Sequence, residues 1–441
     1  MPASPAPMVA RVLFGLLVAS PAWWLLGIDW LLYPLALCGL ALALPAVRRP
    51  PLDRWQWLLA LLVLWLLFCL LLALLRGDVP TMRGLAAAHN LVLLATGLAV
   101  VRVVEAIATS GVPPAWPRYL ARLGVLVAVG AIALPLAVPA PATGLQLPTL
   151  FGALTGRELP GLLGEAQIVE ILDPYSFPAL PLGRPVLLGM TTMAATLIIP
   201  LLAAAALAHG LTVRDSTTAH DRRILGWLAA LFIAAALVSM SRSVYLGLCA
   251  GLVAYLLASG VRWQQILAGA LVAAGLGALW LLGEGLGRAG STELRVWVYA
   301  ASFEALDAAG YLTGVGFRPE GLTEPNIPVG SHSTPLSLLV RGGLPALLVG
   351  AVLFWGLPWW HLLRTTLRLR RAQGAGHTRC AQARLLLLHA VLGMISVWLL
   401  FADIDAYALV TVLVFIVLAI FWQPDRLHRW VVGEARWRAQ T

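Results

Sequence analysis

A chain of 441 residues in which 60% are apolar and only 11% charged is not a soluble globular protein, where about a quarter of residues carry charge. Its net charge of +10 would favour nucleic-acid binding in a soluble protein, but here the distribution of the charge carries more information than the sum. The apolar runs are continuous rather than alternating, which favours helices over strands. We therefore expect an all-α polytopic membrane protein with no nucleic-acid partner.

About twenty apolar residues suffice to cross a bilayer as a helix, and the chain contains about twelve runs of this kind. The first run shows no convincing cleavage site and is expected to remain as the first span. The twelve runs lie at about 10–27, 31–47, 55–75, 85–104, 119–138, 187–208, 224–240, 244–260, 266–283, 334–360, 385–402 and 406–422.

Arginine carries all of the basic charge, and its distribution among the connections predicts the orientation. With twelve spans, the arginine-rich connections and the tail all fall on the same side as the N-terminus. Basic residues concentrate on the cytoplasmic side of membrane proteins, so both termini are expected in the cytoplasm. The connections and tail concerned lie at 48–54, 214–223, 261–265, 361–384 and 423–441.

Two long loops lie on the opposite side, at 139–186 and 284–333, and divide the spans into groups at 1–138, 187–283 and 334–441. Both loops are too long to be simple turns and are expected to contain short amphipathic helices. The first contains "PGLLGEAQIVEILD", which begins at Pro160. The second contains "STELRVWVYAASFEALDAAG", which predicts a helix capped by Ser291 or Thr292 and ended by Gly310.

His332 is the one histidine expected at the outer mouth of the spans. It lies in "SHSTPLSLLVRGG", just before a proline suited to the first turn of a helix. Imidazole is the usual general base near neutral pH, and a helix N-terminus favours anions. An isolated loop histidine is more often ordinary surface, but these neighbours make His332 the candidate catalytic residue.

Few arginines lie on the outer side, so each of them is informative. Arg242 follows a serine at a hinge between two spans, Arg184 ends the first long loop, Arg295 lies on the predicted loop helix, and Arg341 lies two turns into the tenth span. Arginines at span ends often extend to lipid phosphates. A group of four without any lysine is more typical of an anion site, because guanidinium binds phosphate oxygens in pairs and stays charged.

Metal and disulfide chemistry have weaker support. "FADIDAY" places Asp403 and Asp405 at the outer turn between the last two spans, and such a pair could hold a divalent ion at a sugar-diphosphate site. Nothing near it in the sequence completes the coordination, and aspartate is ordinary in a turn. We therefore predict no metal and no cofactor. The four cysteines have no metal or disulfide spacing: Cys38, Cys69, Cys249 and Cys380.

Four stretches resemble the O-antigen ligase and polymerase superfamily of bacterial envelope enzymes. They are "SRS" at 241–243, "ELRVWVYAASFEAL" with the following "YLTGVGF" at 293–317, "SHSTPLSLLVRGGLPALLVG" at 331–350 and, more weakly, "GRPVLLG" at 183–189. The resemblance covers residues 180–360 and implies a GT-C-like fold in the bacterial inner membrane. It implies a glycosyltransferase that moves a glycan from undecaprenyl diphosphate to lipid A-core at the periplasmic face.

The resemblance also implies residue roles. His332 would orient or deprotonate the acceptor hydroxyl, while Arg184 and Arg242, with Arg295 as a weaker third, would bind the departing diphosphate without metal. The accessory candidates are Arg341, Ser331, Ser333 and Tyr299.

Two alternatives remain open at this point. A polymerase of the same superfamily would pass the glycan to another carrier-linked repeat, and the acceptor cannot be read from the loops. A polytopic transporter or lipid-glycan flippase would suit the same span count, but would be expected to show repeated halves and interrupted spans near the midplane.

Overall fold

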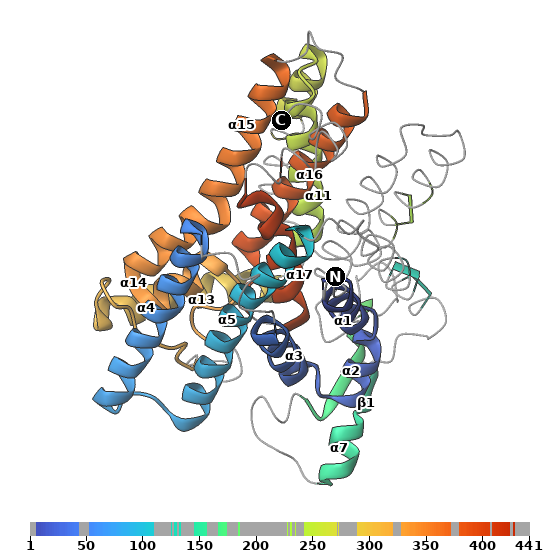
Figure 1. Cartoon of the computed structure of the whole chain (residues 1–441). Helices are drawn as coiled ribbons and strands as arrows, with labels where there is room; N and C mark the ends of the chain where they lie inside the picture. The colour runs from blue at the N-terminus through green and yellow to red at the C-terminus, as the bar shows by residue number, and fades with distance from the viewer. Residues whose placement is uncertain are drawn as a thin grey trace.

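We describe the fold from a computed structural model of the chain (Figure 1). The structure describes residues 6–43, 53–109, 145–156, 166–173, 184–185, 242–270, 289–320, 328–371, 379–405 and 408–423, with a few isolated positions such as 272 and 427. The predicted spans at 119–138, 187–208, 224–240 and 266–283 lie largely or wholly outside these residues.

The described residues are mostly helical, as the apolar runs predict. The helices are α1 Ala6–Val18, α2 Ser20–Leu26, α3 Asp29–Ala43, α4 Arg54–Arg76, α5 Thr81–Thr109, α7 Leu150–Thr155, α11 Arg242–Ala258, α13 Ala289–Ala309, α14 Thr334–Ala351, α15 Leu357–Arg371, α16 Arg379–Phe401 and α17 Ala408–Phe421. A π-helical turn, η3 Val352–Gly356, joins α14 to α15. The strands are β1 Leu145–Pro148, β2 Ile168–Asp173 and β3 Arg184–Pro185.

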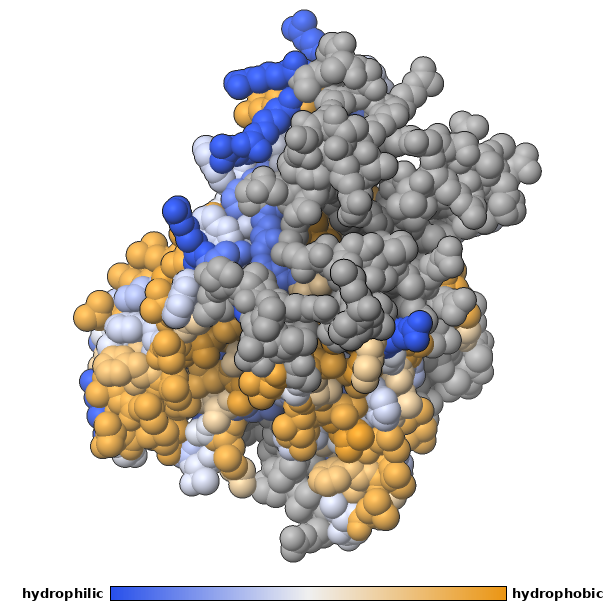
Figure 2. Space-filling view, viewed as in Figure 1, coloured by the Kyte–Doolittle hydropathy of each residue, from blue (hydrophilic) through white to orange (hydrophobic). Residues whose placement is uncertain are grey.

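Within the part of the chain that the structure describes, three helical segments are long and apolar enough to cross a membrane: Arg54–Arg76, Thr81–Ala106 and Thr334–Arg371. Shorter apolar helices accompany them at Asp29–Leu42, Val244–Ala258, Leu385–Phe401 and Leu409–Phe421. The outer face of α4 exposes large apolar side chains, and Figure 2 shows an apolar surface over this side of the molecule. Exposed apolar surface of this extent is what a membrane covers, so the chain has the character of a transmembrane protein.

The core is centred on α17, whose side chains are almost all buried from Leu409 to Trp422. Helices α3, α5 and α15 pack around it. A helix that is apolar on every side is typical of such a central position. The turn that precedes α17 is therefore joined directly to the most deeply buried helix among the described residues.

Two local predictions in the first half of the chain are wrong. The run at 10–27 forms two helices, α1 and α2, with the break at Ala19 just ahead of Pro21, which has no N–H to continue the ladder. Residues 168–173, expected to be helical, form strand β2, which pairs antiparallel with β1 and β3. In β2, Val169 is buried and its neighbour Ile168 is exposed, the alternation of a strand.

The predicted loop helix exists as α13, and its end before Gly310 is confirmed. It begins at Ala289, before the serine and threonine expected to cap it, so the predicted N-cap is wrong. Its buried side chains are Val298, Ser302 and Leu306, spaced four apart along one face. This face packs on α14, where Leu306 joins a buried apolar cluster with Leu336, Leu339 and Val340.

Helix α14 is interrupted at Gly343, whose backbone has φ +64° and ψ −163°. The loop after α13 docks into this break, because Val315 N–H donates to Val340 O at 2.7 Å and Leu344 N–H donates to Tyr311 O at 2.8 Å. Trp65 on α4 donates its indole N–H to Gly342 O at 2.7 Å. The polar backbone groups at the break are thus paired within the protein, as membrane depth requires.

We expect Gly343→Ala to destabilise the protein by about 3 kcal/mol or more. An added Cβ would lie 2.3 Å from Leu312 O and 2.4 Å from Tyr311 O, in a left-handed backbone that alanine rarely adopts. Gly77→Ala is the matched control, because Gly77 also has a left-handed backbone (φ +77°) but open space around it, so only about 1 to 2 kcal/mol is expected. Denaturant titration in detergent measures both, and equal losses would contradict the docking of the loop into the break.

Candidate functional site

His332 has the left-handed backbone that its position in a tight turn imposes, with φ +64°, the one positive φ found on a non-glycine residue in the described part of the chain. A conformation of this kind costs about 1 to 3 kcal/mol and persists only where surrounding contacts hold it. Asp403 supplies those contacts. Its carboxylate accepts the backbone N–H of His332 at 3.1 Å and that of Ser333 at 3.2 Å.

The turn around His332 is held from two further directions. Thr334 donates its hydroxyl to Ala402 O at 2.6 Å and accepts the backbone N–H of Ile404 at 3.0 Å, which joins the start of α14 to the connection between α16 and α17. On the other side, Gly330 N–H donates to the buried Ser302 hydroxyl of α13 at 2.9 Å. The backbone that carries His332 is therefore fixed between α13 and the base of α17.

Beneath this turn lies a buried network of alternating charges, formed by Arg341, Asp405, Arg318 and Asp403. Asp405 pairs with Arg341 at 2.6 Å and with Arg318 at 3.0 Å. Arg318 lies 3.4 Å from the Asp403 carboxylate and donates to the Ser337 hydroxyl at 2.5 Å. Two positive and two negative side chains balance one another, and the chain of contacts runs from inside α14 up to the backbone of His332.

Two members of this network that lie outside the spans, Asp405 and Arg318, remain charged because of their partners. Burial alone would raise the pKa of Asp405, but the guanidinium groups of Arg341 and Arg318 lower it below its usual value. Burial would likewise lower the pKa of Arg318, but the carboxylates of Asp403 and Asp405 raise it. Asp405 is therefore ionised, and Arg318 protonated, throughout the neutral range.

The His332 side chain is exposed above the network. Partial removal of water from the ring lowers its pKa below the usual 6.5, Arg295 and Arg318 lower it further by their charge, and Asp403 partly offsets this. The imidazole is accordingly neutral at pH 7 and able to accept a proton. Tyr299, one helical turn after Arg295 on α13, has its pKa raised by burial, with Arg295 lowering it and Asp403 raising it.

The structure brings together several of the predicted residues. Arg295 lies close enough to His332 and Tyr299 for its charge to lower the pKa of both side chains. Ser333 caps α14 by accepting the N–H of Leu336, and Ser331 is buried next to His332. Arg341 is buried and paired with Asp405, so it acts from within the protein.

Arg184 and Arg242 cannot be placed in the same way. Arg184 begins β3 and Arg242 begins α11, but their side chains lie outside what the structure describes.

Arg318 is the residue that the sequence interpretation missed. It follows the Gly314-x-Gly316 pair of the quoted "GVGF" motif, and both glycines have left-handed backbones that press against neighbouring main chain. Its place just after the two glycines is the one local signal in the sequence, and it does not reveal the distant partner Asp405. Asp403 and Asp405 were noticed, but as a possible metal pair; the structure gives them arginine partners and the histidine backbone instead.

The arrangement can accept a proton at an imidazole carried on a tightly held backbone, beside one partly buried and one buried guanidinium group. Among the described residues no group of three or more His, Cys, Asp or Glu side chains is placed to hold a metal ion. No protein-family model matches this chain, and no curated protein matches it either.

Proposed function

We propose that this chain is a glycosyltransferase of the O-antigen ligase type, with about twelve spans in a GT-C-like arrangement in the bacterial inner membrane. It would move an O-antigen glycan from undecaprenyl diphosphate to lipid A-core at the periplasmic face. The observation that carries the proposal is His332: a neutral, exposed imidazole on a strained backbone that a carboxylate holds in place.

In this proposal His332 accepts the proton of the acceptor hydroxyl as that oxygen attacks the anomeric carbon of the donor glycan. The bond between this carbon and the diphosphate oxygen breaks, and the diphosphate leaves with the electron pair. Arg295 lies near His332 and would stabilise the developing negative charge, together with Arg184 and Arg242. Arg318, Asp403, Asp405 and Arg341 act through the backbone of His332 and are positioning residues.

A polymerase would use the same chemistry with an acceptor linked to the lipid carrier, and remains the first alternative.

The interruption of α14 is the observation that would favour a transporter, because transporters build substrate sites from broken helices. In a transporter, however, the backbone groups that lose their helical hydrogen bonds at the break face the substrate. Here Val340 O, Gly342 O and Leu344 N–H are bonded to Val315, Trp65 and Tyr311, so the break serves to dock a loop.

The test is transfer by the purified protein in detergent with an undecaprenyl-diphosphate glycan, with and without lipid A-core, and with and without EDTA. Glycan appearing on lipid A-core, with no loss on chelation, is the expected result. Lengthening of the carrier-linked glycan without lipid A-core would make the protein a polymerase. Loss of transfer on chelation would overturn the metal-free mechanism, and absence of any transfer by folded protein would favour transport.

The pH profile gives a more specific expectation. A base works in its neutral form, so transfer should fall as the pH drops through the pKa of His332, which lies below 6.5. Arg295→Gln removes a positive charge that lowers this pKa, so the acid limb of its profile should move to higher pH. Arg368→Gln, which changes an exposed arginine on α15, is the control. An unmoved acid limb in Arg295→Gln would show that His332 is not the titrating group.

A further inference from the structure

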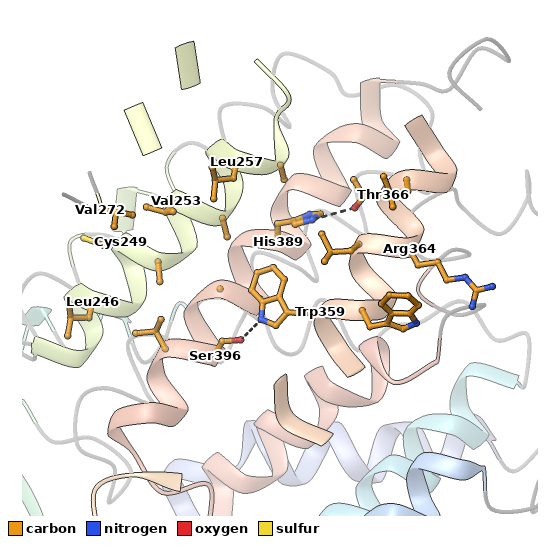
Figure 3. Close-up of a pocket in the computed structure, with 18 of the residues that line it drawn as sticks. Leu246, Cys249, Val253, Leu257, Val272, Trp359, Arg364, Thr366, His389 and Ser396 are labelled. Atoms are coloured by element: carbon orange, nitrogen blue, oxygen red, sulfur yellow. Dashed lines mark hydrogen bonds between the residues drawn. The ribbon is translucent and has the colours of Figure 1, made fainter. Parts of the chain in front are cut away.

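A second site lies among α11, α15 and α16, where a cavity of about 1110 Å³ opens between the helices (Figure 3). None of its lining residues belongs to the network around His332. Apolar side chains from all three helices dominate the lining, among them Val253 and Leu257 of α11, Leu363 of α15 and Val397 of α16. The cavity is thus built from helices that are apolar enough to lie within a membrane.

Four uncharged polar side chains of the lining are already paired with one another. Trp359 donates its indole N–H to the Ser396 hydroxyl at 2.9 Å, and His389 lies 3.4 Å from the Thr366 hydroxyl, as the dashed lines in Figure 3 show. The other ring nitrogen of His389 contacts Leu385 O at 2.8 Å. The interior therefore leaves few polar groups for a ligand to satisfy, which suits hydrocarbon.

Two arginines of α15, Arg364 and Arg370, belong to the lining of the cavity, and Figure 3 shows the Arg364 side chain extending outward from that helix. Helix α15 carries four arginines and no acidic residue. Arg364 has no hydrogen bond or ion pair with any described residue, whereas Arg370 uses one of its five donors on Ala258 O at 2.8 Å.

We propose that this cavity binds a phospholipid with an anionic headgroup, its acyl chains along the apolar lining and its phosphate at Arg364 and Arg370. The volume exceeds the usual range for small-ligand pockets, about 300 to 1000 Å³, and accommodates more than a single short chain. Basic pockets between membrane helices are the recognised setting for anionic headgroups. The charge complementarity favours this occupant over a zwitterionic or neutral lipid, and the proposal is independent of the transfer reaction.

The test is native mass spectrometry of the full-length protein, delipidated and then titrated with phosphatidylglycerol or phosphatidylcholine of the same chain length. Phosphatidylglycerol should be retained more strongly. Arg364→Glu combined with Arg370→Glu should weaken its binding by about tenfold or more, since each basic residue near a phosphate contributes roughly a fivefold gain. Arg368→Glu is the matched control, because Arg368 is an exposed arginine of the same helix outside the lining and should change binding little.

Val253→Trp provides a variant that keeps every charge and fills the cavity, and it should abolish retention of the lipid. Glycerol 3-phosphate, which has the phosphate without the chains, should not bind. Equal retention of the two lipids, or equal effects of Arg368→Glu and the double variant, would overturn the headgroup assignment. Preferential retention of undecaprenyl phosphate would assign the cavity to a carrier lipid instead, and retention of no lipid would remove the site.

Discussion

Asp405→Leu should lower the free energy of unfolding by about 3 to 5 kcal/mol. We expect this loss to be the largest for any single substitution in the network. Asp405 is fully buried and pairs with both Arg341 and Arg318. Its removal leaves two guanidinium groups facing one carboxylate, Asp403, so one buried positive charge has no partner. Mixed-micelle denaturation of the variant and the parent chain in parallel measures this loss.

A double variant separates the effect of the unbalanced charge from the effect of altered packing. Arg341→Met together with Asp405→Leu leaves Arg318 paired with Asp403 and restores neutrality. We expect the double variant to be more stable than Asp405→Leu alone, with a coupling of about 1 to 3 kcal/mol between the two positions. If the two losses simply add, then the charges are solvated and do not form one network.

The long apolar elements of the fold could be predicted from the sequence because their signals are local. The run at 55–75 becomes α4, Arg54–Arg76, since Asp53 forms a capping box with Gln56 and Gly77 supplies the left-handed end. The run at 406–422 becomes α17 for the same reason of uninterrupted apolarity. The type of a short element was harder to predict. Strand β2 has only six residues, which are too few for an apolar pattern to separate a strand from a helix.

The residues of the site likewise differ in whether the sequence alone could predict them. His332 could be found because its chemistry is unusual at that place in the chain. Arg318 could not, because its importance depends on Asp405, 87 residues further along, and on the folding of the 310–317 segment into the break of α14. Pairing over such separations leaves no periodic pattern in one sequence. The pairing also changes the meaning of "FADIDAY", from a candidate metal pair to the support of the histidine turn.

His332→Ala is expected to lower the rate of glycan transfer by about 100- to 10,000-fold, the usual contribution of a general base. The side chain is exposed and its own backbone bonds to Asp403 do not involve the ring, so the variant should fold with nearly unchanged stability. His332→Gln, which keeps a polar side chain of similar reach but cannot take a proton near neutral pH, should be almost as slow. Transfer is measured with the undecaprenyl-diphosphate donor and lipid A-core acceptor.

Arg83→Ala is the matched control for His332→Ala. Arg83 forms a 3.2 Å ion pair with exposed Glu320, two residues beyond Arg318, so the change alters charge beside the site without reaching the imidazole. A pair of this kind contributes about 1 kcal/mol or less to stability, and transfer should be close to that of the parent chain. If His332→Gln instead retained full activity while Asp403→Asn lost it, the turn itself would be the functional feature. The role of Asp403 would then be to shape a binding surface, and the base would have to be sought elsewhere.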